Sequence, residues 1–173
     1  LTGGTPSADS VTQGAAANAC DDNTGTKWET ANVALPHWWK YDFGAGVTHR
    51  IEKLRIYPYA YGGNCEIKDF TLQGSNNDSD WDIVFTGTVA NSESWQDFTF
   101  SNSGSYRYYK VNITTIYRTD VTTAGVREFE MMEAIYRSGI MNWWFMKEAW
   151  DRHKKLWTRD KKLLLPKDLG FSY

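Results

Sequence analysis

The sequence lacks the features that mark membrane-spanning or disulfide-stabilised proteins. No apolar run approaches the roughly 18 residues that a membrane-spanning helix needs. Only two cysteines are present, Cys20 and Cys65. Two are too few for a secreted disulfide framework, so one disulfide and two free thiols both stay open.

The signatures of common catalytic sites are missing too. There is no His-Glu-x-x-His, no Gly-x-Ser-x-Gly, no phosphate-binding glycine loop and no Cys-x-x-Cys. The three histidines, His37, His49 and His153, are scattered along the chain. Paired acids such as Asp80 and Asp82 fall in a turn-rich stretch, where carboxylates are usually solvated. We therefore expect a protein that is not an enzyme.

Aromatic residues are abundant, and charge is unevenly divided. The 173 residues include 9 Trp, 10 Tyr and 8 Phe. Residues 1–133 carry 10 Lys and Arg against 17 Asp and Glu, whereas residues 134–173 carry 9 against 4. At about 100–200 residues per domain, the length fits one domain with an appendage. We expect a domain over residues 1–133 and a basic, Trp-rich tail over residues 134–173 that serves for docking or oligomerisation.

Within the domain, residues 38–132 alternate between short apolar-patterned runs and clusters of Gly, Asn, Asp and Ser, which form turns. Within each of seven sets, the apolar residues share one parity and so would lie on one face of a strand. The sets are Trp39, Tyr41 and Phe43; Leu54 and Ile56; Phe70 and Leu72; Ile83 and Phe85; Phe98 and Phe100; Tyr109, Val111 and Ile113; Phe129 and Met131. This pattern predicts an all-β sandwich or barrel. We assign Trp28, Trp38 and Trp81 to its core, because large rings fill the space between packed sheets.

Five segments, in order, carry a resemblance to a known family. Residues 19–28 read ACDDNTGTKW and are similar to A-F-D-G-N-x-x-T-x-W. Residues 36–44, 67–75, 106–111 and 126–131 are similar to P-x-W-I-x-V-D-L-G, I-K-D-F-x-I-x-x-S, A-R-Y-x-R-L and I-A-E-I-E-V. The chain thus resembles the discoidin, or coagulation factor 5/8 type C, domains and the family 32 carbohydrate-binding modules. The resemblance covers the domain but not the tail, and implies an eight-stranded jelly-roll β-sandwich with a galactose-binding-like fold.

The first of these segments contains a loop rich in oxygen-bearing side chains. With turn carbonyls, such a loop can surround a hard cation that takes about six to eight oxygen ligands. The resemblance implies a structural Ca²⁺ held by the side chains of Asp21, Asn23 and Thr26, by carbonyls of the same loop, and by Glu128 from the last strand. A polar turn held by Asx and Ser/Thr hydrogen bonds alone is the alternative.

The family binds ligands through loops at one end of the sandwich, and here residues 57–64 read YPYAYGGN. A sugar presents an apolar C–H face and a rim of hydroxyls, so its site needs a flat aromatic ring with a few polar groups around it. The residues that we expect to bind a glycan are His37, Tyr59, Tyr61, Asn64, Tyr117, Arg118 and Asp120. Tyr59 stands where the family usually has Arg, which departs from the ordinary galactose site. Tyrosines that merely cap the sandwich are the alternative.

In the tail, Trp143, Trp150 and Trp157 recur every seven residues and predict an amphipathic helix over about residues 140–157. Together with Trp144 they are too many for so short a segment to bury, so they must pack on another surface. We favour a protein partner or self-association. One alternative is that the tail packs on the chain's own domain. Another is that its basic residues bind a membrane surface or nucleic acid, of which nucleic acid is not expected.

Together these features predict a non-enzymatic recognition or adhesion module. It would bind cell-surface or polymeric glycans through loops at one end of a calcium-stabilised sandwich, and its tail would attach it to a larger assembly. The alternative is a structural virion component, such as a phage decoration, capsid or tail protein, that uses the sandwich for protein–protein contacts. We expect it outside the cell or on a particle surface. Because Leu1 is not an initiator methionine, we also expect a start that was processed, trimmed or taken from inside a longer polypeptide.

Overall fold

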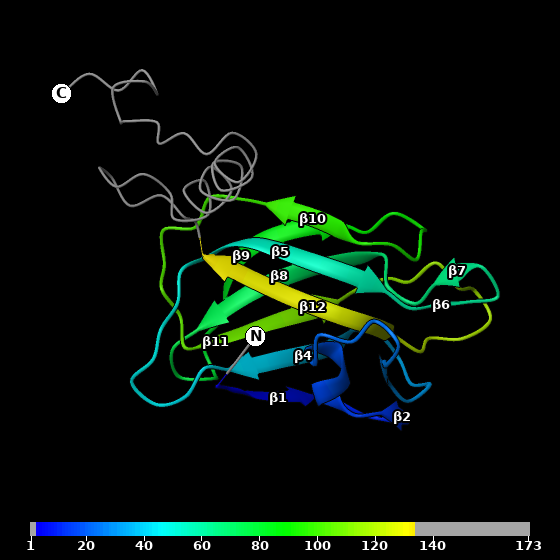
Figure 1. The fold of residues 1–173 in the computed structure, drawn as a ribbon, viewed down its shortest axis with the longest axis horizontal. Coiled ribbons are helices and arrows are strands. Elements are labelled where there is room, and N and C mark those ends of the chain that lie inside the picture. Colours follow the sequence, from blue (N-terminus) through cyan, green and yellow to red (C-terminus); the bar gives the residue numbers. More distant parts are fainter. Residues whose placement is uncertain (1–2, 134–173) are drawn as a thin grey trace, which may run out of the picture. The chain divides into compact units, whose positions relative to one another are not determined.

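Two five-stranded antiparallel sheets pack face to face in the computed structural model, which describes residues 3–133 (Figure 1). The first sheet has the order β1 (Thr5–Ala8), β4 (His37–Asp42), β11 (Tyr108–Ile113), β8 (Asp69–Ser75) and β9 (Asp82–Thr88). The second has the order β10 (Gln96–Thr99), β5 (Ile51–Pro58), β12 (Gly125–Glu133), β3 (Trp28–Glu29) and β2 (Gln13–Gly14). A separate hairpin joins β6 (Ala60–Tyr61) to β7 (Asn64–Cys65), and a 3-10 helix, η1, spans Ala16–Ala19.

The predicted all-β sandwich is confirmed. Its described part contains twelve strands rather than the expected eight, and four of the twelve are only two residues long. The predicted helix over about residues 140–157, with Trp143, Trp144, Trp150 and Trp157, lies outside the described residues. Within residues 3–133 no helix is long and apolar enough to cross a membrane.

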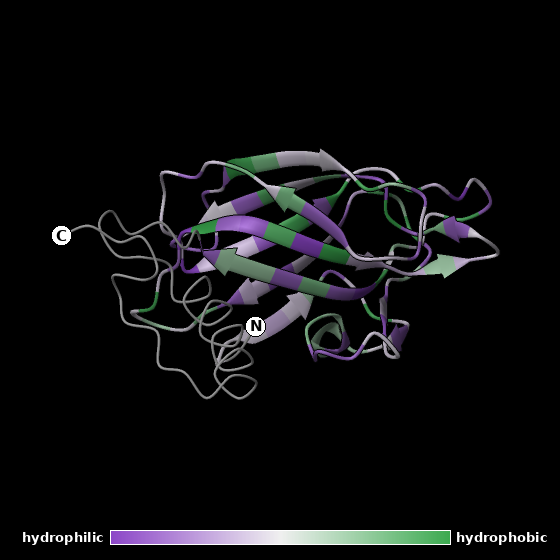
Figure 2. Ribbon diagram, turned by 45° about the horizontal axis from the view of Figure 1, so that its top comes forward, coloured by the Kyte–Doolittle hydropathy of each residue, from purple (hydrophilic) through white to green (hydrophobic). Residues whose placement is uncertain are grey.

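The core forms where the inward faces of the two sheets meet. Alternate residues of β11, Tyr109, Val111 and Ile113, are buried, as the two-residue period of a strand requires. Figure 2 shows hydrophobic and hydrophilic residues alternating along the strands of the sandwich. Trp28, as predicted, has no exposed surface, and the rings of Trp39 and Phe129 lie 5.0 Å apart between the sheets. Aromatic packing thus fills much of the interior.

The prediction for Trp38 and Trp81 was wrong. Trp38 lies between the buried His37 and Trp39, so the strand period turns its side chain to the outer face of the first sheet, where it is half-buried. Trp81 precedes β9, and its ring packs under the ammonium of Lys110, with 4.0 Å from Nζ to the ring centroid. Neither belongs to the core.

Ile83 also departs from the expected pattern, because β9 contains a register shift. Phe85 pairs with the inward Leu72, but the next pair joins Ile83 to the outward Gln73, with Val84 left over between them. The extra residue lets Ile83 face solvent, where it is 66% exposed, although it has the same parity as Phe85.

Candidate functional site

A tight hairpin carries the aromatic loop residues beyond one end of the sandwich (Figure 1). Strands β6 and β7 pair Ala60 with Cys65 and Tyr61 with Asn64, leaving Gly62 and Gly63 as a two-residue turn. Both glycines have positive φ, 61° and 83°, a combination typical of type I′ turns. Glycine takes up both positions without strain, so the turn holds Tyr61 and Asn64 opposite each other near the tip.

Tyr61, Arg118 and Asp120 come together at this end. Tyr61 is 60% exposed, and the guanidinium carbon of Arg118 lies 4.8 Å from its ring centroid. Arg118 also binds Asp120 with two hydrogen bonds, from Nε to Oδ1 at 3.1 Å and from Nη2 to Oδ2 at 2.6 Å. The guanidinium holds the pKa of the Asp120 carboxyl below its usual range. The result is an exposed aromatic ring beside an ionised carboxylate.

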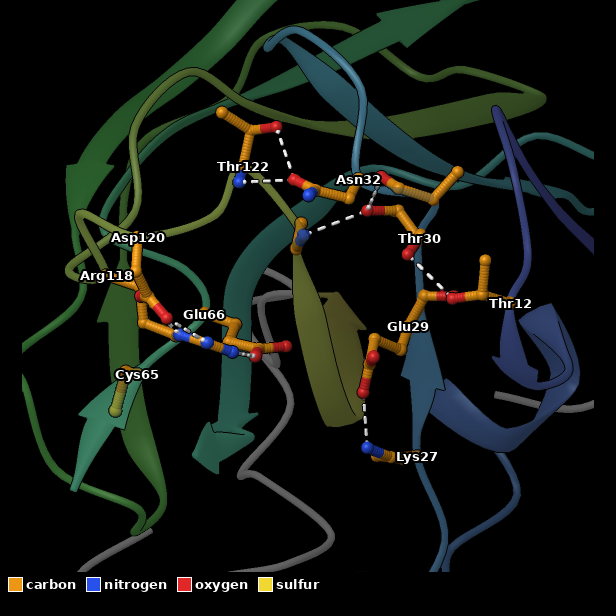
Figure 3. A network of polar contacts seen from close by, with 12 residues as sticks. Thr12, Lys27, Glu29, Thr30, Asn32, Cys65, Glu66, Arg118, Asp120 and Thr122 are labelled. Carbon is orange, nitrogen blue, oxygen red and sulfur yellow. Dashed lines mark hydrogen bonds and ion pairs between the residues drawn. The ribbon is translucent and has the colours of Figure 1, made fainter. Parts of the chain in front are cut away.

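A buried carboxylate orients Arg118 from behind (Figure 3). Glu66 is 1% exposed, and its Oε1 accepts a hydrogen bond from Nη1 of Arg118 at 2.7 Å. Its Oε2 is buried and has no hydrogen-bond partner among residues 3–133. Burial raises the pKa of Glu66, although Arg118 acts in the opposite direction. One guanidinium therefore serves two carboxylates, which fixes its direction toward Tyr61.

Gly125 makes room for this carboxylate. A Cβ atom at position 125 would lie 2.5 Å from Oε2 of Glu66 and 2.9 Å from Cδ1 of Tyr59. The backbone also joins these residues, since the Gly125 amide donates to the Glu66 carbonyl at 3.1 Å and the Glu66 amide donates to the Tyr59 carbonyl at 2.9 Å. The glycine is thus needed for a close approach of side chains from β12 and from the segment around the hairpin.

Three further predicted residues lie nearby but have other contacts. Nδ2 of Asn91 donates to Oδ1 of the exposed Asn64 at 3.1 Å. The half-buried Tyr59 ring lies under the ammonium of Lys27, at 3.7 Å from Nζ to the centroid. The hydroxyl of Tyr117 donates to the carbonyl of Val89 at 2.8 Å. Tyr59 and Tyr117 therefore support the loops, while Asn64 stays accessible at the hairpin.

His37 was predicted as a ligand-binding residue, but the structure places it inside the domain. Its side chain has no exposed surface; Nδ1 lies 2.5 Å from Oδ2 of Asp9 and Nε2 lies 2.9 Å from the carbonyl oxygen of Thr122. Both ring nitrogens thus have a polar partner inside the domain. His37 joins the start of β4 to two other segments instead of facing a ligand.

Sequence reasoning missed the residues that hold the loops in place. They are Glu66, Asn91 and Asn32. Oδ1 of Asn32 accepts hydrogen bonds from the amide and the hydroxyl of Thr122 at 2.8 and 3.0 Å (Figure 3). Asn91 and Asn32 lie among turn formers. Glu66 lies in the sequence between two apolar residues, Cys65 and Ile67. This position was the one available sign that its carboxylate is buried.

The predicted metal loop brings several oxygen atoms to one hydroxyl. Oγ1 of Thr26 lies 3.0 and 2.9 Å from the two carboxylate oxygens of Asp21, 2.8 Å from the carbonyl of Asn23 and 3.4 Å from the carbonyl of Asn18. A hydroxyl has a single proton to donate, so four acceptors around it exceed what it can satisfy. An oxygen-only donor set of this kind suits a hard cation such as Ca²⁺.

Glu128 reaches the same loop from β12. It is 2% exposed, and its Oε2 accepts a hydrogen bond from the amide of Asn23 at 3.3 Å. Burial, with the nearby carboxylates of Asp21 and Asp22, raises the pKa of Glu128 to about 7. Within residues 3–133 no three His, Cys, Asp or Glu side chains are grouped as a metal site, so any bound ion would need carbonyl and hydroxyl ligands as well. Cys20 and Cys65 are both free thiols and provide no disulfide.

Comparison with known proteins identifies the domain. A family model of the F5/8 type C group, described as "NedA-like, galactose-binding domain", matches residues 18–111. The chain belongs to this galactose-binding family. The resemblance stated from the sequence motifs is thereby confirmed, and the sandwich can be called a galactose-binding-like domain.

Solved structures share the fold of this galactose-binding-like domain. CpGH89CBM32-5 from Clostridium perfringens, solved with GalNAc-β-1,3-galactose, has a TM-score of 0.66 and 19% identity over 75% of this chain and 95% of its own. The family 32 module of C. perfringens NanJ, solved with galactose, has a TM-score of 0.63 and 23% identity over 74% and 92%. Chitosan-binding module 2 of Paenibacillus sp. IK-5, solved with chitotriose, has a TM-score of 0.61 and 23% identity over 75% and 95%. A search of curated protein sequences gave no match.

Proposed function

We propose that this protein is a non-catalytic carbohydrate-binding module that recognises glycans through the hairpin end of the sandwich. The observation that carries the proposal is the exposed Tyr61 ring next to the Arg118–Asp120 pair, in a domain of a galactose-binding family. A sugar ring would stack its C–H face on Tyr61, while the Asp120 carboxylate and the Asn64 amide bind hydroxyls. Related modules solved with galactose, GalNAc-β-1,3-galactose and chitotriose support a sugar as the ligand class.

A glycan array followed by titration calorimetry tests this proposal on the full chain. Tyr61→Ala removes the stacking surface, and we expect it to weaken binding of an array-positive sugar about tenfold or more, as loss of an aromatic contact does in buried recognition sites. Val47→Ala is the control, because Val47 is an exposed apolar residue in the loop between β4 and β5, away from the hairpin. Absence of any sugar binding by a protein whose circular dichroism shows an intact sandwich would refute the proposal.

The proposal includes a structural Ca²⁺ in the loop around Thr26. The crowding of oxygen acceptors about one hydroxyl and the buried carboxylate of Glu128 support it. When bound, the ion would neutralise the carboxylates of Asp21 and Glu128 and join the N-terminal loop to β12. Metal analysis of the purified protein, with Asp21→Ala as the variant that removes a ligand, measures occupancy; no calcium under saturating conditions would rule the ion out.

We further propose that residues 134–173 attach the domain to a larger assembly, outside the cell or on a particle surface. The net charges of the two parts, −7 for residues 1–133 and +5 for residues 134–173, favour contacts between copies or with an oppositely charged partner. A structural role in a virion or similar particle is the second candidate, and the four tail tryptophans favour it. Light scattering of the full chain over a range of concentrations tests whether the protein assembles. A monomer at all concentrations removes the role in assembly but leaves the proposed glycan recognition intact.

A further inference from the structure

The outer face of the first sheet combines aromatic rings with lysines, at a distance from the loops of the sugar site. Trp38 and Lys40 alternate with buried residues on β4, and Tyr108 and Lys110 do so on β11, so all four point outward. Nζ of Lys40 lies 5.5 Å from the Trp38 ring centroid and 5.7 Å from that of Tyr108. With Trp81 under Lys110, these five residues form what we call the lysine–aromatic face.

The two lysines of this face repel each other. Lys40 and Lys110 are direct partners in the β4–β11 register, and like charges placed opposite each other destabilise a sheet. Lys40 has a carboxylate partner, since its Nζ lies 2.6 Å from Oδ2 of Asp78. Lys110 makes no ion pair with any residue in the described range 3–133 and is half-buried. Burial, and then the charge of Lys40, lower its pKa.

Uncommitted amide groups flank these lysines. Gln73 is the register partner of Lys110 on β8, and Asn112 is the register partner of Trp38 on β11. Neither side chain forms a hydrogen bond with another residue of the described part of the chain, although both are half-buried. Next to Asn112, the buried Oγ1 of Thr71 also has no partner among residues 3–133. Hydrogen-bonding capacity is thus concentrated around an ammonium that has no ion-pair partner in the described part of the chain.

We propose that the lysine–aromatic face is a second binding surface, which takes an acidic polysaccharide whose sugars carry carboxylates. A uronate carboxylate between Lys40 and Lys110 would supply the missing counter-charge in charge-assisted hydrogen bonds. The rings of Trp38 and Tyr108 offer apolar surface to the C–H groups of the sugars, and Gln73 and Asn112 can bind their hydroxyls. The surface is formed by strand residues, so it is distinct from the hairpin site and does not depend on it.

The number of ammonium groups argues against a polyphosphate chain. The face offers one pair, of which Lys40 already binds Asp78, whereas a polynucleotide is held through many phosphate contacts. An acidic sugar chain places isolated carboxylates at ring spacing, which suits one pair of ammonium groups.

Titration calorimetry of the full chain with an oligogalacturonate tests the proposal. We expect the acid to bind and its methyl-esterified form, which has the same rings without the charge, to bind about tenfold more weakly or not at all, since charge-assisted hydrogen bonds are lost. Lys110→Gln should weaken binding of the acid about tenfold for the same reason. Lys53→Gln is the matched control, because it removes one lysine, paired with Asp97, from the second sheet, and it should leave the affinity unchanged.

Further measurements separate this surface from the hairpin site. Tyr61→Ala should bind oligogalacturonate as the wild type does, so failure of the proposed sugar site would leave this result standing. Equal binding of acid and ester, no binding of the acid by the full chain, or an unchanged affinity in Lys110→Gln overturns the proposal. Tighter binding of a single-stranded oligonucleotide, lost in Lys110→Gln, also overturns it and assigns the face to nucleic acid.

Discussion

Nη1 of Arg118 donates a hydrogen bond to Oε1 of Glu66 over 2.7 Å, and the carboxylate that receives it is 1% exposed. The two residues are 52 positions apart in the chain, one directly after β7 and the other in the loop before β12. Their contact fixes the guanidinium that stacks on Tyr61. The stability of the domain and the proposed glycan site therefore meet at one ion pair.

Removal of the guanidinium should be costly and depend on pH. Arg118→Met leaves the Glu66 carboxylate buried without a counter-charge, and we expect the free energy of unfolding to fall by about 3 kcal/mol near neutral pH. Burial already raises the pKa of Glu66, so in the variant the carboxyl holds its proton more tightly in the folded than in the unfolded state. The loss should therefore grow as the pH rises from about 5 to about 8. Urea unfolding at both pH values measures it.

Arg50→Met is the control for this prediction. Arg50 is 46% exposed and pairs with Glu52 at 3.2 Å, so its loss should cost less than about 1 kcal/mol at either pH. A similar loss in both variants would show that the Glu66–Arg118 pair contributes no more than a surface ion pair.

The metal-free protein should become less stable as the pH rises toward 8. The pKa of Glu128 is about 7 in the folded protein against an ordinary value of 4.5, so between these values the folded state binds more protons than the unfolded state. The contribution of Glu128 to stability is present below about pH 4.5 and is lost as the pH rises through about 7. Over this range the free energy of unfolding should fall by about 3 kcal/mol. Urea unfolding in a chelator across this range measures the slope.

Glu128→Gln and added calcium complete this experiment. The variant has no carboxylate to titrate, so the slope should be smaller than in the wild type. Calcium at pH 8 should restore the stability of the wild type but not of the variant, because the ion stabilises the ionised carboxylate. A wild-type slope equal to that of Glu128→Gln contradicts the assignment of the titrating group.

His37→Leu should affect folding and leave sugar binding intact. The substitution removes both polar contacts of the buried ring, with the carboxylate of Asp9 and the carbonyl of Thr122, and we expect a loss of about 3 kcal/mol. His49→Leu is the control, because His49 is 35% exposed and pairs with Glu133, and it should cost less than about 1 kcal/mol. Thermal unfolding and glycan titration below the transition measure both. A folded His37→Leu protein that no longer binds sugar would return His37 to the ligand site.

Gly125→Ala should crowd the residues that support the proposed sugar site. The new methyl group would meet Oε2 of Glu66 at 2.5 Å and the ring of Tyr59 at 2.9 Å, and overpacking of this kind costs about 1–3 kcal/mol. In a double-mutant cycle with Glu66→Ala, the combined loss should be smaller than the sum of the single losses, because the carboxylate that clashes is gone. Simple additivity in denaturant unfolding would show that the strain lies elsewhere.

Local pattern predicted much of this fold. The parity of Trp39 and Tyr41, or of Tyr109 and Val111, follows from the two-residue period of a strand and needs no knowledge of the partner strand. Parity did not separate Trp38 from Trp39, because aromatic residues occupy both faces of β4. It also failed at Ile83, where a register shift inside β9 reverses the face without a mark in the sequence.

The candidate site was predicted in part for a related reason. Tyr61 and its turn glycines form a local unit, and the Arg118–Asp120 pair spans only two residues, so both could be inferred from neighbouring positions. The burial of His37 depends on Asp9 and Thr122, which are 28 and 85 residues away. Such contacts exist only once the sheets have packed.

The hairpin of β6 and β7 pairs with neither five-stranded sheet. Residues at its tip can consequently change while the hydrogen bonds of the sandwich stay the same. If the proposed function holds, substitutions of Tyr61 itself can change the sugar preference without bringing the domain closer to the threshold below which it no longer folds. Residues at the hairpin tip are therefore free to vary without loss of foldability, whereas Arg118 behind the tip serves both the fold and the proposed site.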